Sequence, residues 1–295
     1  MAQSLIALIT ATGAWATDQD APLLVSALAD VGIVAEAAIW DAPEIDWSRF
    51  DAAVVRSPWD YVDRPNEFLA RLEQVQLSTP VLNPVEVLRW NSDKHYLEDL
   101  KTAQIPVVPT RFVSDPDFST NNLFPDQGRF VVKPTISSGS RNTAQYSQDE
   151  RELAAAHVTD LIFAGHQVMV QPYVASIDQV GETGLMYFFG EFSHGFGKAA
   201  LLTHGKAQVD GLYAVETITP RQPSSAQLEV AQQALQVASQ HCQGAELLYA
   251  RVDLLQGPDG QPQVLELELT EPSYFLGTDP SSPARAARAY ARALS

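Results

Sequence analysis

The stretch that decides the fold runs from Leu247 to Leu255 (LLYARVDLL), turns through Gly257–Gly260 (GPDG) and returns from Val264 to Leu269 (VLELEL). Both runs alternate apolar and polar residues, and the segment between them is rich in turn-forming Gly, Pro and Asp. Because alternate side chains of a strand point to opposite faces, each run has one apolar and one charged face. The sequence therefore predicts a β-hairpin near the C-terminus.

The charged face of this hairpin carries Arg251 and Asp253 from the first strand, and Glu266 and Glu268 from the second. Three carboxylates held this close repel one another, and they protonate unless cations lie among them. Mg²⁺ binds carboxylates in this way and shares its remaining coordination with substrate phosphates. The pattern predicts a magnesium site. The alternative, on spacing alone, is an ordinary hairpin with a solvated polar face.

The turn also predicts a register. If Gln256 pairs with Gln261, Asp253 lies opposite Val264. The other face of the hairpin is then expected to pack in the core: Ala250, Val252, Leu254, Leu265, Leu267 and Leu269.

Composition limits the classes of partner. The chain has 295 residues with 36 Asp and Glu against 19 Lys and Arg, a net charge of −17. This acidity argues against nucleic acid or an anionic membrane as a partner, since both need a basic surface, but a few placed cations suffice for a nucleotide. The single cysteine, Cys242, excludes an internal disulfide and a cysteine-based zinc framework.

The N-terminal stretch Met1–Ala16 lacks the basic start and long apolar run of a signal peptide. Leu5–Thr10 is better interpreted as a first buried strand. No stretch is long enough to span a membrane, so a cytoplasmic location is expected.

The first part of the chain alternates strands and amphipathic helices, which predicts a parallel sheet. Ligands of such sheets bind beyond the carboxyl ends of the strands, where Arg56 and Ser57 fall, so Arg56 is a candidate for binding a substrate carboxylate. The expected helices are Ala21–Val31, with Leu23, Leu24, Ala27 and Leu28 on one stripe, and Pro65–Val75, and the expected strands are Leu5–Thr10, Val34–Ile39, Ala52–Arg56 and Val81–Asn83.

The second part indicates an α+β arrangement. A helix is expected in Trp90–Ala103, starting after Asn91 or Ser92 with Lys94 in its first turn. Ser147 and Glu150 form a capping box for a helix over about 148–157. The other expected elements are strands at Pro109–Val113, Arg129–Pro134 and Gln167–Pro172, a hairpin over Gly181–Lys198, and helices at Ala226–Gln240 and Pro283–Leu294.

In the order of these elements the chain resembles the ATP-grasp superfamily of carboxylate–amine ligases, and within it the glutathione-synthetase type and the D-cycloserine-synthetase-like group. The phrases that carry the resemblance are Arg56–Tyr61 (RSPWDY), Asn83-Pro84, Trp90–Lys94 (WNSDK), Gly181–Thr183 (GET) and Glu266–Ser273 (ELELTEPS). The resemblance implies an α/β (α+β) ATP-grasp fold with an N-terminal lobe at 1–89, a central subdomain at 90–174 and a C-terminal subdomain at 175–295.

The resemblance also implies an ATP site. Lys94 and Lys133 come from separate segments and are expected to neutralise phosphate oxygens. The loop containing Ser138 and Gly139 offers backbone N–H groups to a phosphate and is expected to close over it.

The segment Gln171-Pro-Tyr173-Val174 resembles the hinge whose backbone groups contact the adenine, and Glu182 resembles the residue that binds the ribose hydroxyls. The chain departs from the pattern at two positions. Gly184 stands where an arginine is common, and Glu268 where many relatives have asparagine.

We expect ATP-dependent activation of a carboxylate as an acyl phosphate, followed by attack of an amine. Asp253, Glu266 and Glu268 would hold Mg²⁺, as one ion or two, with Mn²⁺ as a possible substitute. Lys198 and Arg251 are the remaining candidates for contacts with phosphate or acyl oxygens, and Arg56, Ser57 and Ser273 for contacts with the substrate.

Two alternatives stay open: a ligase that closes a ring within one molecule, as in D-cycloserine formation, and a two-lobed solute-binding protein. The expected partners are small amino-acid-like substrates. A second copy of the chain is also expected, because the homodimer is the commonest oligomer among soluble proteins. The segment Thr203–Arg221 is a lid or a long connection. Neither His194 nor Cys242 stands out as a catalytic group.

Overall fold

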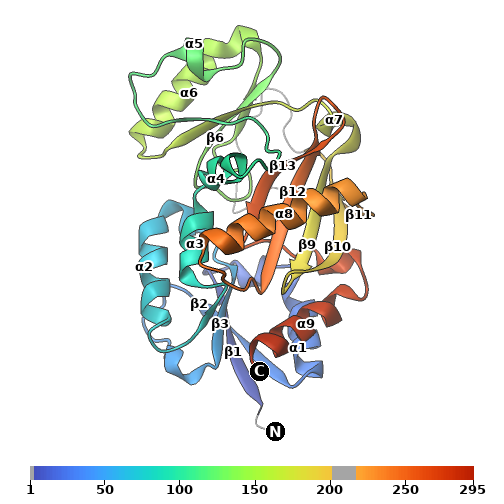
Figure 1. Ribbon diagram of the computed structural model, residues 1–295. Coiled ribbons are helices and arrows are strands. Elements are labelled where there is room, and N and C mark those ends of the chain that lie inside the picture. Colours follow the sequence, from blue (N-terminus) through green and yellow to red (C-terminus); the bar gives the residue numbers. More distant parts are fainter. Residues whose placement is uncertain (1–2, 201–216) are drawn as a thin grey trace.

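The computed structural model describes residues 3–200 and 217–295, and within them the chain forms three sheets (Figure 1). The part of Thr203–Arg221 before Thr217 lies outside the described residues. The three sheets fall within the ranges expected for three domains, whose boundaries stay a prediction.

The N-terminal sheet is parallel, with the strand order β2 (Ile33–Ile39), β1 (Ser4–Thr10), β3 (Ala52–Ser57) and β4 (Val81–Leu82). The predicted βα alternation is confirmed, because apolar strands such as β3 are buried on both faces by helices. These helices are α1 (Ala21–Asp30), α2 (Pro65–Val75) and α3 (Val85–Ser92).

The central sheet is antiparallel, with the order β5 (Arg111–Val113), β8 (Val168–Pro172), β6 (Phe130–Pro134) and β7 (Ala144–Tyr146). Helices α5 (Thr120–Leu123) and α6 (Arg151–Phe163) belong to the same lobe, at the top of Figure 1. The capping box of Ser147 and Glu150 is confirmed, at a 3-10 turn (Gln148–Glu150) that leads into α6.

The C-terminal sheet is also antiparallel and contains the hairpin that opened the sequence analysis. Its order is β11 (Ile218–Pro220), β10 (Glu191–Lys198), β9 (Glu182–Phe188), β12 (Tyr249–Gln256) and β13 (Pro262–Glu268). Helix α8 (Ser225–His241) covers one face of β12 and β13 (Figure 1), where its alanines and leucines join the core. The short helix α7 (Ile177–Val180) precedes β9.

The last helix, α9 (Ser282–Ala293), returns to the N-terminal part of the chain and packs beside α1 (Figure 1). Buried residues of β1, α1, β9, β12 and α9 form one hydrophobic cluster. The two ends of the chain therefore share a core. The remaining described elements are α4 (Tyr96–Thr102) and short 3-10 helices at Trp15–Thr17, Trp47–Arg49, Tyr61–Asp63 and Leu276–Thr278.

The predicted hairpin register was wrong, by one residue at the turn and by two at Asp253. Gln256 pairs with Pro262, and a bulge between Asp253 and Leu254 then places Asp253 opposite Glu266 rather than Val264. The bulge inserts one extra residue, Leu265, into β13, which bends the strand. As a result Val264 packs in the core, whereas Leu265 lines a cavity.

Two smaller predictions were also wrong. The helix expected over Trp90–Ala103 is two helices, α3 and α4, so Lys94 lies in the break between them, where its backbone N–H donates to Thr135 O at 3.0 Å. Leu23 does not join the buried stripe of α1 and is 41% exposed.

The buried side chain of Asn83, which lies between β4 and α3, joins this part of the chain to the hairpin. Asn83 Nδ2 donates to Tyr249 O at 3.0 Å and Leu269 O at 2.8 Å, and its Oδ1 accepts from Leu248 N. These bonds fix β12 and β13 against the N-terminal sheet.

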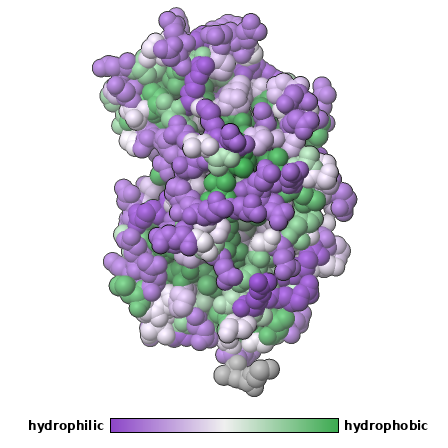
Figure 2. Space-filling model, in the orientation of Figure 1, coloured by the Kyte–Doolittle hydropathy of each residue, from purple (hydrophilic) through white to green (hydrophobic). Residues whose placement is uncertain are grey.

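The surface is mostly hydrophilic on the face shown in Figure 2, with hydrophobic residues exposed in small areas. Among the described helices, none is both long enough and apolar enough to cross a membrane.

Candidate functional site

A cavity that is open to solvent lies where the three sheets meet, and its empty space of about 1210 Å³ includes solvent outside its mouth. Its lining comes from the segment after β3 (Tyr61), the break before α4 (Lys94), the central sheet (Lys133 and Gln171) and the hairpin (Glu266). Clefts between lobes are the usual place for small-molecule sites.

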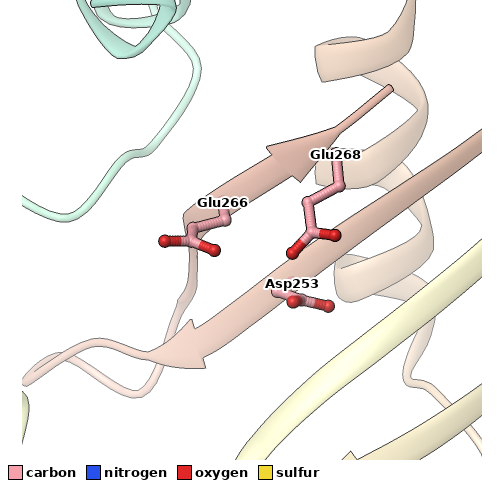
Figure 3. Close-up of side chains that lie close together, drawn as sticks. All are labelled: Asp253, Glu266 and Glu268. Carbon is pink, nitrogen blue, oxygen red and sulfur yellow. The ribbon is translucent and has the colours of Figure 1, made fainter. Parts of the chain in front are cut away.

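Three carboxylates from neighbouring strands of the hairpin converge beside this cavity: Glu266 and Glu268 line it, whereas Asp253 is buried and is not part of the lining. Asp253, on β12, faces Glu266 and Glu268, on β13, and Figure 3 shows the three groups directed toward one shared space. One oxygen of each lies within 4.8 Å of the others. The register shift contributes to this approach, because it places Asp253 directly opposite Glu266.

Basic side chains pair with these carboxylates. Lys133 Nζ lies 2.9 Å from Glu266 Oε1, and Lys198 Nζ lies 3.2 Å from Asp253 Oδ2. Arg251 bonds to Asp253, at 2.9 Å, and to Glu268. The negative charge of the cluster is thus balanced by protein cations.

The three carboxyl groups differ in pKa. Burial works to raise all three, but Lys133 and Lys94 outweigh it and lower the pKa of Glu266, while Arg251 and Lys198 do the same for Asp253. For Glu268 burial dominates, and the pKa rises to about 8. At Glu268 burial outweighs Arg251, and the negative charges of Asp253 and Glu266 add to the rise in pKa.

The donor set fits Mg²⁺. Carboxylate oxygens are its preferred protein ligands, and Asp253, Glu266 and Glu268 each offer one oxygen within 4.8 Å of the others. The surrounding lysines are long enough to turn from carboxylate to phosphate.

The phosphate-loop candidates line the same cavity. Lys94 Nζ donates to Ser137 O at 2.9 Å, next to Ser138 and Gly139. Gly139 has φ of 61°, and the loop after β6 turns there with backbone that glycine adopts at little cost.

The expected hinge residues Gln171, Tyr173 and Val174 line the cavity where β8 ends. Gln171 is buried, and its Nε2 donates to Thr110 Oγ1 at 2.9 Å. The Tyr173 ring lies under the Arg129 guanidinium, 4.1 Å from its centroid. The backbone of this segment is accordingly held in place from both sides.

Glu182 also lines the cavity, and its Oε2 lies 3.2 Å from Lys198 Nζ. The absence of an arginine at position 184 has a steric reason. A Cβ on Gly184 would lie 2.2 Å from the Phe196 ring and 3.0 Å from Asp253 Oδ1, so no side chain fits there.

Three substrate candidates lie elsewhere. Arg56 is 1% exposed and does not line the cavity; it donates to Pro272 O and lies over the Tyr274 ring. Ser57 is buried against Thr10, with 2.9 Å between the hydroxyls. The Ser273 carbonyl accepts from Arg251, and Ser273 is likewise absent from the lining. Arg56 joins two parts of the chain through the interior.

Two other titratable groups lie apart from the cavity. Both ring nitrogens of His194 have protein partners, Ser193 Oγ and Tyr274 O. Burial raises the pKa of the Cys242 thiol to about 11.

The sequence analysis did not assign Tyr61, Asn91, Thr270 or Glu271, all of which line the cavity. All four residues lie within the motif phrases, so the signal was present, but their direction depends on how the segment after β3, helix α3 and the end of β13 meet.

Comparison with known proteins shows similarity over nearly the whole chain. Residues 6–83 match the family described as D-cycloserine synthetase DcsG, N-terminal domain. The chain is 40% identical to the cycloserine biosynthesis protein DcsG of Streptomyces lavendulae over 301 residues, which cover 98% of this chain and 99% of that protein.

Solved structures agree. The crystal structure of D-cycloserine synthetase DcsG superposes with a TM-score of 0.90 at 38% identity, covering 99% of this chain and 100% of that one. The ATP-grasp ligase PsnB, in a complex with a precursor variant, Mg and ADP, gives a TM-score of 0.67 at 15% identity, with 100% of each chain covered. D-alanine–D-alanine ligase from Bacillus anthracis gives 0.67 at 14%, covering 99% and 97%; these last two show the fold alone.

Proposed function

The chain belongs to the D-cycloserine synthetase family of ATP-grasp ligases, and from this premise we propose that it uses Mg²⁺ and ATP to activate a carboxylate-derived carbonyl for attack by an amine. It is an ATP-dependent enzyme that forms C–N bonds. The likeness to ligases across the whole length gives no support to a solute-binding protein.

The observation that carries this proposal is that Asp253, Glu266 and Glu268 converge within 4.8 Å of one another beside a cavity that Glu266, Glu268 and lysines from three segments line. A bound magnesium ion supplies charge neutralisation and a fixed geometry for the triphosphate. Asp253, Glu266 and Glu268 would hold it, with room for one ion or two, and Mn²⁺ has the same preference for oxygen ligands.

The residues of the chain then have separate tasks. Lys133 and Lys198, released from their carboxylates when the ion binds, are placed to turn toward phosphate oxygens, and Lys94 lies beside the loop at Ser138 and Gly139. Arg251 holds Asp253 in orientation. Because phosphoryl transfer needs little covalent help from the protein, positioning and charge neutralisation account for most of the catalysis.

At the far end of the cavity, the Gln171–Val174 segment would receive the adenine and Glu182 the ribose hydroxyls. The Gln171–Val174 segment lies at the end of β8 and Glu182 at the start of β9, so the two would contact different parts of the nucleotide.

Among ligase reactions, ring closure within one amino-acid-like molecule is the one that we propose, because the likeness to D-cycloserine synthetase extends over the whole chain at 38% identity. In this reaction the amine and the activated carbonyl belong to the same molecule, and phosphate leaves as the C–N bond closes. The homodimer, the cytoplasmic location and the domain boundaries at 89/90 and 174/175 stay predictions.

The test uses Glu266→Gln, with Glu98→Gln, an exposed carboxylate outside the cavity, as its matched control. We expect Glu266→Gln to lose substrate-dependent ADP release by about 100-fold or more, as for removal of a charged group that acts at the transition state, with an unchanged circular dichroism spectrum. Mass spectrometry of the products separates ring closure from joining of two molecules. Full turnover by Glu266→Gln would contradict the metal assignment.

A further inference from the structure

Glu271 is the carboxylate in the cavity that has no cation. Of the four carboxylates that line the cavity in the described part of the chain, Glu182, Glu266 and Glu268 each pair with Lys or Arg, whereas Glu271 forms no ion pair there. It lies three positions after Glu268, where β13 has ended.

The Tyr61 side chain lines the same cavity and lies close enough to the Glu271 carboxylate to lower its pKa. Tyr61 is 2% exposed and lies in the 3-10 helix that follows β3. Its ring packs on Phe68, with 4.9 Å between the centroids, and this contact fixes the ring. The pair thus joins the N-terminal sheet to the end of the hairpin.

Lys94 and Arg251 favour the charged form of Glu271 without forming an ion pair with it, but burial outweighs them. Burial raises the pKa of Glu271 to about 7, and it raises the pKa of Tyr61 well above its usual value. The tyrosine therefore stays a neutral hydrogen-bond donor. A carboxylate that lines a cavity and forms no ion pair is stabilised by a cation that brings its own hydrogen-bond donors.

The nearby protein cations have other partners. Lys94 Nζ donates to Ser137, at 2.9 Å from its carbonyl and 3.2 Å from its hydroxyl. Arg251 holds Asp253 and Glu268. A cation that pairs with Glu271 thus comes from a ligand. A protonated amine has the required positive charge and three hydrogen-bond donors.

We propose that Glu271, with Tyr61, forms the subsite that binds the cationic amino group of the amino-acid-like substrate. The inference deepens the proposed function and rests on it for the class of substrate. Because Glu271 lies three positions after Glu268, it would hold the amino group of the substrate near the carbonyl that is activated. Glu271 would then discriminate amino acids from molecules of the same shape without the amine.

The test compares two pairs of probes that differ in the amino group. D-Cycloserine is compared with isoxazolidin-3-one, the same ring without its amine, and D-serine with D-glycerate. Dissociation constants are measured by calorimetry with the full chain in Mg–ADP, for the wild type, Glu271→Gln, Tyr61→Phe and the control Glu98→Gln.

We expect the wild type and Glu98→Gln to bind the amine of each pair about tenfold more tightly or better, the size of one charge-assisted hydrogen bond. Glu271→Gln should bring this ratio close to one by weakening the amine alone, with the affinity for Mg–ADP unchanged. Tyr61→Phe, which keeps the ring, should give an intermediate ratio.

A ratio in Glu271→Gln equal to that of the wild type overturns the subsite, as does an equal loss for both members of a pair, which indicates general damage to the cavity. Failure of the proposed function gives a different result. A wild type that does not bind D-cycloserine but prefers D-serine to D-glycerate refutes ring closure and still supports the subsite.

Discussion

Asn91 is the residue whose removal most directly tests how the hairpin is held. It lies in α3 and is 6% exposed. Its Nδ2 donates to Leu267 O at 2.7 Å, and its Oδ1 accepts from Leu269 N at 2.6 Å and from Thr270 Oγ1 at 3.3 Å. These bonds lie on both sides of Glu268.

Asn91→Ala leaves the Leu267 carbonyl and the Leu269 N–H buried without partners. Each unsatisfied group costs about 1–3 kcal/mol, so the free energy of unfolding should fall by about 4 kcal/mol. For a chain of this size that corresponds to a fall in Tm of roughly 10 °C. Because Glu268 is attached to the freed segment, the Mg²⁺ concentration for half-maximal ADP release should also rise.

The assay is urea unfolding followed by tryptophan fluorescence, together with the magnesium titration of ADP release. Asn66→Ala is the matched control, because Asn66 is an exposed residue of another helix, α2. Its free energy of unfolding should change by less than about 0.5 kcal/mol. If Asn91→Ala is no less stable than Asn66→Ala, the bonds of Asn91 do not support the hairpin and the reasoning fails.

Other perturbations give equally definite results. Gly184→Ala drives a Cβ into the Phe196 ring at 2.2 Å, so urea unfolding should show a loss of about 1–3 kcal/mol; an unchanged midpoint would contradict this contact. Cys242, buried with a raised pKa, should react with a thiol reagent at pH 8 only after denaturation, and fast labelling of the native chain would refute its burial. The pKa of Glu271 rises to about 7 on folding, so the folded state binds the extra proton and stability falls as pH rises from about 4.5 to 7. Glu271→Gln should flatten that fall in Tm, and an unchanged slope would show that another group causes it.

The limits of sequence reasoning show most clearly at the hairpin. Alternation placed Asp253, Glu266 and Glu268 on one face correctly, because side-chain direction along a strand depends only on local geometry. The pairing was off by one at the turn, where Gln256 pairs with Pro262, and the bulge at Leu265 made it off by two at Asp253. Alternation along each strand specifies neither the turn pairing nor the bulge.

The same distinction applies to Arg56 and Glu271. Arg56 lies at the carboxyl end of β3, where ligands commonly bind, yet α9 returns from the far end of the chain and helps to close that region, with Tyr274 beneath the guanidinium. Glu271 has no periodic pattern of its own. Only the approach of Tyr61 gives it a place in the cavity.

The sequence by itself determined the order of strands and helices, the charged and apolar faces of each, and the kind of chemistry that the carboxylates and lysines support. These properties follow from local periodicity and from residue type. The tertiary structure alone decided which charges pair, which candidates reach the cavity and which are buried away from it. The physical reason is that such contacts join residues far apart in the chain, and their distances depend on how three sheets and the returning helix α9 pack together.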